Sequence, residues 1–273
     1  MKYYERMVEL GSFSRDGLAM HLHLNDATTA SVLRNYLKKG YIERVRHNFY
    51  VVISIENKQP ILSRYAIGGR LFPDACVSHH SAFEVYGYAN QVFYEVYVTT
   101  QSRFKDFEYD GITYHRMAPK GNVQVETYRG VSVTSIEQTV IDSIHTIDQI
   151  GGLEEFLRCL ALVPFLDERK LLLALENYQI GFLYQKTGFL LEQVNDSFGL
   201  SNQFFDICKQ QVPKADRYVS KANANYVYHP KWKLMGPKHI NSVINKGVLD
   251  DASMEHNGDE TIFRIVPKAI TLT

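Results

Sequence analysis

The order of apolar and polar residues near the N-terminus predicts two helices in succession. The apolar residues of the earlier one recur at helical spacing and are Tyr3, Met7 and Leu10. Leu18 and Leu22 are also about one turn apart, which predicts a helix over residues 14–23 with both leucines buried. The chain therefore opens with short amphipathic helices.

A further helix is expected after Asn25-Asp26. The short polar side chain of either residue can accept a hydrogen bond from the free backbone N–H groups of a first helical turn. The apolar positions expected to face the core of this helix are Ala30, Leu33 and Leu37. Gly40 follows where a left-handed residue ends a helix.

A β-hairpin is predicted directly after this helix. Residues 41–45 lead into it, and His47-Asn48 can form its tight turn. Residues 49–53 then return as a run rich in β-forming side chains. Helices closed by such a hairpin predict a winged helix-turn-helix domain over residues 1–58.

The rest of the chain mixes strand-like and helical patterns. Residues 56–60 are polar and end in proline, which makes them the expected linker. Helices are expected over residues 61–71, 78–86 and 135–144, and strands over residues 92–99, 112–117, 123–128 and 131–133. Further helical segments are expected over residues 153–162, 168–178, 182–194 and 202–212, followed by a strand-like tail from Tyr226.

These elements predict an α+β protein with α/β-like features. A second, effector domain is expected over residues 61–273, with a mixed sheet flanked by helices over residues 61–147 and a mainly helical section with a mixed tail over residues 148–273. The polar linker further predicts that residues 1–58 can be removed without unfolding this second domain.

Composition excludes several classes of protein. No stretch approaches 18 apolar residues, so no transmembrane helix is expected, and the charged N-terminus M-K-Y-Y-E-R lacks the apolar core of a signal peptide. Cys76, Cys159 and Cys208 are far apart and form no C-x-x-C pair. They are expected to be buried free thiols of a cytoplasmic protein. Trp232, the single tryptophan, either anchors the tail to the body or marks a binding surface.

The charge is unevenly distributed along a chain whose formal net charge is zero. Residues 1–52 contain eight Lys and Arg but five Asp and Glu, a balance of +3, so the remainder carries −3. A positive N-terminal module favours a nucleic-acid partner. Small hydroxyls near the start of the second helix of the motif suit the major groove, and Asn35 can pair bidentately with adenine.

Basic residues of this helix and of the hairpin are expected to meet phosphates. The candidate DNA-binding residues are Ser14, Thr28, Thr29, Ser31, Arg34, Asn35, Lys38, Lys39, Arg44, Arg46, His47 and Asn48. Units of three helices and a hairpin also serve as protein-docking modules, which is the alternative for this surface.

Candidate catalytic residues are sparse. Adjacent histidines on a helix point about 100° apart, so His79 and His80 are expected to be solvent-facing or helix-terminal and not to share a metal ion. No G-x-S-x-G elbow is present. Glu168-Arg169-Lys170 matches the E-x-K of some nucleases but opens an amphipathic helix. We therefore expect no catalytic residue, metal ion or cofactor, and a protein that is not an enzyme.

An ordered series of motifs resembles the AbiEi family of antitoxins. The motifs are G-S-F-S-R-D-G-L at 11–18, R-H-N-F-Y-V at 46–51, V-S-H-H-S-A-F-E-V-Y-G at 77–87, V-Y-V-T-T at 96–100, G-I-T-Y-H-R at 111–116 and V-S-V-T-S-I-E-Q-T-V-I-D at 131–142. Gln138 stands where that family usually has Arg, and Phe83 where it usually has Leu. The resemblance spans about residues 5–145 and fades after Ala161.

This resemblance implies a winged-helix regulator of a type IV toxin–antitoxin system for phage defence by abortive infection. Such a protein is implied to repress its own operon at inverted repeats in double-stranded DNA, and to counter a co-encoded nucleotidyltransferase-like toxin without assumed direct contact. Two alternatives stay open. A DNA-targeted enzyme such as a nuclease would show a carboxylate cluster on strands of the second domain, and a ligand-sensing regulator would show a deep apolar pocket there.

Overall fold

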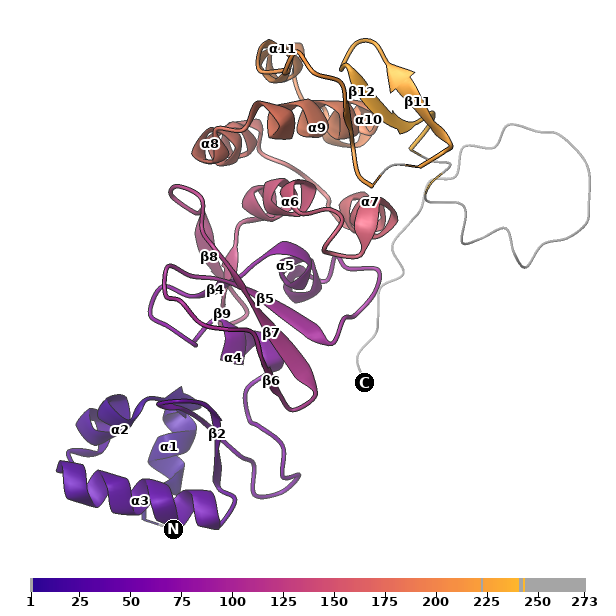
Figure 1. The fold of residues 1–273 in the computed structure, drawn as a ribbon. Helices are drawn as coiled ribbons and strands as arrows, with labels where there is room; N and C mark the ends of the chain where they lie inside the picture. Colours follow the sequence, from indigo (N-terminus) through magenta and orange to yellow (C-terminus); the bar gives the residue numbers. More distant parts are fainter. Residues whose placement is uncertain (1, 222, 241–242, 244–273) are drawn as a thin grey trace, which may run out of the picture.

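The computed structural model describes residues 2–221, 223–240 and 243. It confirms the α+β class, with an N-terminal module, a central sheet and a helical section stacked in that order along the molecule (Figure 1). The predicted tail is described over residues 226–240 and at Val243, and its remainder lies outside the described residues.

The N-terminal module has the element order of a winged helix. Its elements are α1 (Tyr4–Leu10), β1 (Ser12–Phe13), α2 (Arg15–Leu22), α3 (Asp26–Lys38), β2 (Ile42–Arg46) and β3 (Phe49–Val52). The strands form an antiparallel sheet in the order β1-β3-β2. The helix and hairpin positions predicted from the sequence are confirmed, including the turn at His47-Asn48, where Asn48 adopts a left-handed φ of 55°.

Local capping explains where the two helices of the motif begin. The Ser14 hydroxyl accepts from Gly17 N at 3.1 Å, and Asn25 Oδ1 accepts from Thr28 N at 2.9 Å. Each bond satisfies a backbone N–H that has no partner inside the helix. The start of each helix is thus determined by a capping side chain and a backbone N–H within the same four residues.

The buried face of α3 differs from the predicted one. Thr29, Val32 and Leu33 are buried, whereas Ala30 is partly exposed and Leu37 is 37% exposed. The prediction of Ala30 and Leu37 as core residues was therefore wrong. The reason is that Thr29 Oγ1 donates to Asn25 O at 2.8 Å, so its hydroxyl is satisfied within the helix and the residue can occupy a core position.

The second domain is built on a mixed sheet, six-stranded among the described residues, in the order β6-β7-β5-β4-β9-β8. Its elements are α4 (Arg64–Gly68), β4 (Cys76–Val77), α5 (His79–Tyr86), β5 (Glu95–Thr99), β6 (Phe107–Tyr109), β7 (Ile112–Met117), β8 (Val125–Tyr128), β9 (Val131–Thr134) and α6 (Ile136–His145). The predicted helix over residues 61–71 is only five residues long, and the short strands β4 and β6 escaped prediction.

Helices cover both faces of this sheet. A Cβ at Gly68 of α4 would lie 2.9 Å from Val96 and 3.2 Å from Val98, so these valines face α4. Tyr97 lies between them in the strand and points to the other face, where it stacks near His79 of α5. Figure 1 shows α4 and α5 on opposite sides of the sheet.

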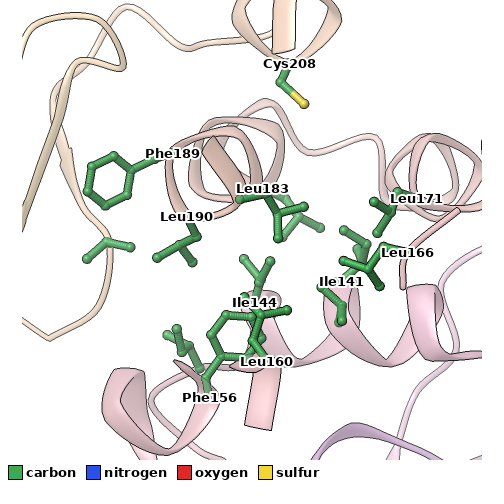
Figure 2. Close-up of a cluster of buried hydrophobic side chains, with 14 of the residues drawn as sticks. Ile141, Ile144, Phe156, Leu160, Leu166, Leu171, Leu183, Phe189, Leu190 and Cys208 are labelled. Atoms are coloured by element: carbon green, nitrogen blue, oxygen red, sulfur yellow. The ribbon is translucent and has the colours of Figure 1, made fainter. Parts of the chain in front are cut away.

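The helical section packs on the α5 side. Its elements are α7 (Gly152–Leu162), α8 (Glu168–Tyr178), α9 (Gly181–Glu192), α10 (Asn195–Phe198), α11 (Asn202–Gln210), β10 (Arg217–Tyr218), β11 (Tyr226–His229) and β12 (Leu234–Pro237). Figure 2 shows Leu183 and Leu190 of α9 among Ile144 of α6 and Phe156 and Leu160 of α7. The helix α9 is largely buried, and the predicted buried free thiols of the three cysteines are confirmed. Every helix described is too short or too polar to cross a membrane.

Trp232 anchors the small sheet formed by β10, β12 and β11 to α9. Its indole is 2% exposed and donates from Nε1 to Glu192 Oε2 at 2.8 Å. The ring lies directly on Gly188, because a Cβ built there would be 2.1 Å from Trp232 Cη2. Of the two roles predicted for Trp232, the structure shows the anchor.

Gly188→Ala is expected to lower the free energy of unfolding by about 1–3 kcal/mol, because the added methyl group must displace the indole. Urea unfolding followed by circular dichroism measures this. Combined with Trp232→Leu, which removes the clashing ring, the same substitution should cost much less. An equal loss of unfolding free energy in the wild-type and Trp232→Leu proteins would show that Gly188 does not support the indole.

The N-terminal module and the second domain share a hydrophobic cluster. One side of the β2–β3 hairpin places Val45, Phe49 and Val51 in the same buried cluster as Ile67 of α4 and Val98 of β5. Removing residues 1–58 would expose this cluster. The polar segment around residues 56–60 is consequently a turn between packed parts, closed by a bridge between Ile53 and Pro60, and not a free linker.

Candidate nucleic-acid interface

The polar side of α3 is exposed in the part of the chain that the structure describes. Ser31, Arg34, Asn35 and Lys38 are exposed, and Thr28 is half-buried near the helix start. These residues recur every three or four positions, which places them on one face. Figure 1 shows α3 at the end of the molecule remote from α8–α11. The structure thus brings five of the predicted DNA-binding residues together on an accessible helix surface.

Thr29 does not belong to this surface. Its side chain is completely buried and its hydroxyl is bonded to Asn25 O. The prediction of Thr29 as a DNA contact was therefore wrong. The sequence pattern could not separate it from Thr28 and Ser31, because all three carry small hydroxyls and only the helix phase decides which one faces the core.

A polar network fixes the start of α2 against the hairpin turn and α3. Asn48 Oδ1 accepts from Arg15 N at 2.9 Å, and the Arg15 guanidinium pairs with Asp26 Oδ1 at 2.7 Å. Ser14 caps the same helix. Ser14 and Asn48, both predicted to contact DNA, thus hold the start of α2 through these bonds, and Asn48 and His47 at the turn are both exposed.

The basic residues of the hairpin point to two different places. Arg44 is exposed, as is Lys39 at the end of α3. Arg46 instead packs against the second domain, with its guanidinium 4.3 Å from the centre of the Phe72 ring. Burial lowers the pKa of Arg46 from its usual value. Arg44 therefore lies on the free surface of the hairpin, whereas Arg46 faces the second domain.

Sequence reasoning missed the second-domain residues that adjoin the hairpin. A groove of about 630 Å³ separates the two parts and is lined by residues 12–14, 46–49 and 70–73. Arg70 on its far wall donates to Leu10 O at 3.0 Å. No local pattern marks Arg70 or Phe72, because their position beside the hairpin arises only from the tertiary fold.

The two adjacent histidines are buried at the start of α5, so their predicted solvent-facing role was wrong and their helix-terminal place is confirmed. His80 Nδ1 lies 2.9 Å from Glu84 Oε1, and its Nε2 lies 2.9 Å from Glu155 Oε1. Burial alone would raise the pKa of Glu155, but hydrogen bonds from His80, Cys159 and Gln91 N together with the charge of His80 bring it below its usual value.

His80, Glu155 and Cys159 are the one group in the described part of the chain with the spacing of metal ligands, since their ligand atoms lie within 4.8 Å of one another. The polar atoms of this group already have protein partners. Glu155 Oε1 accepts from His80, from Gln91 N at 3.1 Å and from Cys159 Sγ at 3.3 Å. The arrangement is that of a buried hydrogen-bond network between α5 and α7.

A second buried acid, Asp142 of α6, adjoins a cavity of about 190 Å³. Its Oδ1 accepts from Gln138 Nε2 and Tyr178 OH, both at 2.7 Å. Burial raises the pKa of Asp142 to about 6, although these two hydrogen bonds act in the opposite direction. His79 lines the same cavity, and burial lowers its pKa to about 3, so its imidazole is neutral at pH 7.

The pKa of Asp142 predicts a pH-dependent stability. The native state binds this proton more tightly than the unfolded chain, so the contribution is complete below about pH 4 and is lost as the pH rises through about 6. Asp142→Asn should remove that loss, and its stability relative to the wild type should rise by about 2–3 kcal/mol between pH 4 and pH 7. Urea unfolding at pH 4 and pH 7 measures this. If the stability difference between Asp142→Asn and the wild type is the same at both pH values, the raised pKa of Asp142 is contradicted.

Comparison with known proteins defines the fold but not the family. No protein-family model matches the chain, and no curated protein matches it. Among solved structures, the crystal structure of the RV2827C protein from Mycobacterium tuberculosis is similar, with a TM-score of 0.61 over 89% of this chain and 93% of that chain. The two sequences are 13% identical, so this likeness concerns the fold alone.

Proposed function

We propose that this protein is a DNA-binding transcriptional repressor. The observation that carries the proposal is the exposed face of α3, which presents Ser31, Arg34, Asn35 and Lys38 from the second helix of a helix-turn-helix. In such motifs the second helix enters the major groove and its side chains reach base edges. The excess positive charge of residues 1–52 supports the same partner.

The alternative hypothesis that this protein is a nuclease has less support. Metal-dependent cleavage needs carboxylates that share an ion at an accessible site. Within the described residues, the one group with metal-ligand spacing is His80, Glu155 and Cys159, which lies on helices and is buried. We therefore propose a regulator without catalytic activity, cofactor or resident metal.

The motif series shared with the AbiEi family extends the proposal to a biological role. In this role the protein is a cytoplasmic antitoxin of a type IV toxin–antitoxin system, which represses its own promoter at inverted repeats and counters a co-encoded nucleotidyltransferase-like toxin. The motifs at 77–87 and 131–142 form α5 and β9–α6 of the second domain. We assign the antitoxin activity to that domain and DNA recognition to α3.

Two single substitutions should distinguish recognition of DNA bases from contacts with the DNA backbone. Asn35→Ala is expected to lose about 1–3 kcal/mol of discrimination at one or two base pairs, because an amide side chain can bond an adenine bidentately. Arg44→Ala should weaken binding to every duplex equally, because phosphates carry no sequence information. Fluorescence anisotropy with the protein's own promoter and with a random duplex measures both.

The test has two adverse outcomes. Equal loss on both duplexes for Asn35→Ala would show that this residue does not read bases. Failure of the full chain to bind its own promoter, or binding that is insensitive to salt, would overturn the proposed function, since phosphate contacts make affinity fall steeply with salt.

A further inference from the structure

We propose that DNA-backbone binding continues from the hairpin into the second domain, through the groove beside Arg46 and the loop that carries Arg103 and Lys105. This inference rests on the proposed DNA-binding function and extends its interface beyond residues 1–58. The partner it names is the sugar–phosphate backbone of the same duplex that α3 contacts.

The groove has the charge of a phosphate site. Arg46 stands on one wall and Arg70 on the other, and the described lining residues include no Asp or Glu. Arg46 Nη1 is buried and has no hydrogen-bond partner among the described residues. Arg46 and Arg70 both line the groove, and guanidinium groups bind phosphate oxygens through charge-assisted hydrogen bonds.

The adjoining loop of the second domain is held firmly in place. The Arg116 guanidinium donates to three consecutive carbonyls, those of Thr100 at 3.2 Å, Gln101 at 3.3 Å and Ser102 at 2.8 Å. Asp74 accepts from Thr100 Oγ1 and from Gln101 N, both at 2.7 Å. The residues that follow are therefore presented from a fixed base.

The loop places two free cations next to the hairpin. Phe104 stacks on Phe72 at 5.7 Å between ring centres, and its ring centre is also 5.7 Å from the Arg46 guanidinium. Arg103 and Lys105 flank this anchored ring and are exposed. Neither is paired with another side chain in the part of the chain that the structure describes. They are thus available to phosphates.

The loop connects to α3 through a continuous set of contacts. Asp26 at the start of α3 pairs with Arg15, and Arg15 N is bonded to Asn48 at the hairpin turn. The hairpin then reaches Phe72 and the loop through Arg46. These contacts place the hairpin turn between α3 and the loop, and the proposed path of one backbone strand runs from α3 across this turn and along the groove.

The test compares two double variants of the full chain with the same change in charge. Arg103→Ala/Lys105→Ala removes the loop cations. Arg169→Ala/Lys214→Ala removes two exposed cations of the helical section and serves as the matched control. Binding to a fluorescent random-sequence duplex is measured by anisotropy between about 50 and 200 mM NaCl. Circular dichroism melting confirms that both variants are folded.

The loop variant should lower the slope of log affinity against log salt by about 0.9 for each lost phosphate contact, or about 1.8 in total, and the control should leave it unchanged. Equal slopes for the two variants, with clear binding by the wild type, would overturn the inference and leave the proposed function standing. Absence of binding by the wild type would overturn both.

Discussion

Replacing His80 with alanine is expected to lower the free energy of unfolding by about 3–5 kcal/mol, because it leaves two buried carboxylates without their shared partner. Both ring nitrogens of His80 lie 2.9 Å from carboxylate oxygens, one from Glu84 and one from Glu155. Carboxylates only accept hydrogen bonds, so in the interior Glu84 and Glu155 depend on donors such as the ring of His80.

The network extends beyond His80. Glu84 also accepts from the Arg64 guanidinium and from Tyr65 OH. The Phe93 ring stacks on His80 at 4.0 Å between ring centres and closes the site. The network connects α5, next to the sheet, with Glu155 of α7. Its loss should therefore loosen the helical section from the sheet.

Urea unfolding at pH 7 measures the effect, with His115→Ala as the matched control. His115 also faces two carboxylates, Asp106 at 2.7 Å and Glu95 at 3.7 Å, but it is partly exposed. Its loss should cost less than about 1 kcal/mol, as is usual for solvent-screened pairs. Similar losses of unfolding free energy for His80→Ala and His115→Ala would contradict a stabilising role of the buried network at His80.

The elements that sequence could predict are those with local causes. Ser135 and Asn25 each cap a helix that begins at the expected position, and the hairpin turn at His47-Asn48 follows from two residues. The face of α3 was harder, because a buried Thr29 looks like any exposed hydroxyl until its bond to Asn25 is known. The spacing of apolar residues predicts a helix. It does not show which face is buried when a polar side chain in the core bonds to its own helix.

The features that sequence could not predict depend on residues far apart in the chain. His80 and Glu155 are 75 positions apart, and nothing near either residue marks the other. In the sequence, nothing distinguishes Arg46 from Arg44. In the fold, the Arg46 guanidinium lies against Phe72 and Phe104 of the second domain. The candidate interface was thus predictable on α3 and unpredictable where the hairpin meets the sheet.

A triple substitution on α3, Arg34→Ala/Asn35→Ala/Lys38→Ala, is expected to weaken operator binding at least about 100-fold, because contacts of this kind contribute about 1–3 kcal/mol each and 1.4 kcal/mol is tenfold. All three side chains are exposed, so the fold should be unaffected. Point variants are preferable to removing residues 1–58, because the hairpin shares a buried cluster with α4 and the sheet.

In cells, the proposed function predicts that this triple variant loses repression of its own promoter and keeps antitoxicity, since the motifs at 77–87 and 131–142 that resemble the antitoxin family lie in the second domain. A promoter reporter measures repression, and growth after toxin induction, with the variant produced from an unrelated promoter, measures antitoxicity. The wild type and the Arg169→Ala/Lys214→Ala variant, both produced in the same way, should do both. If the triple variant is folded and equally abundant but fails to restore growth, antitoxicity depends on DNA binding and does not reside in the second domain alone.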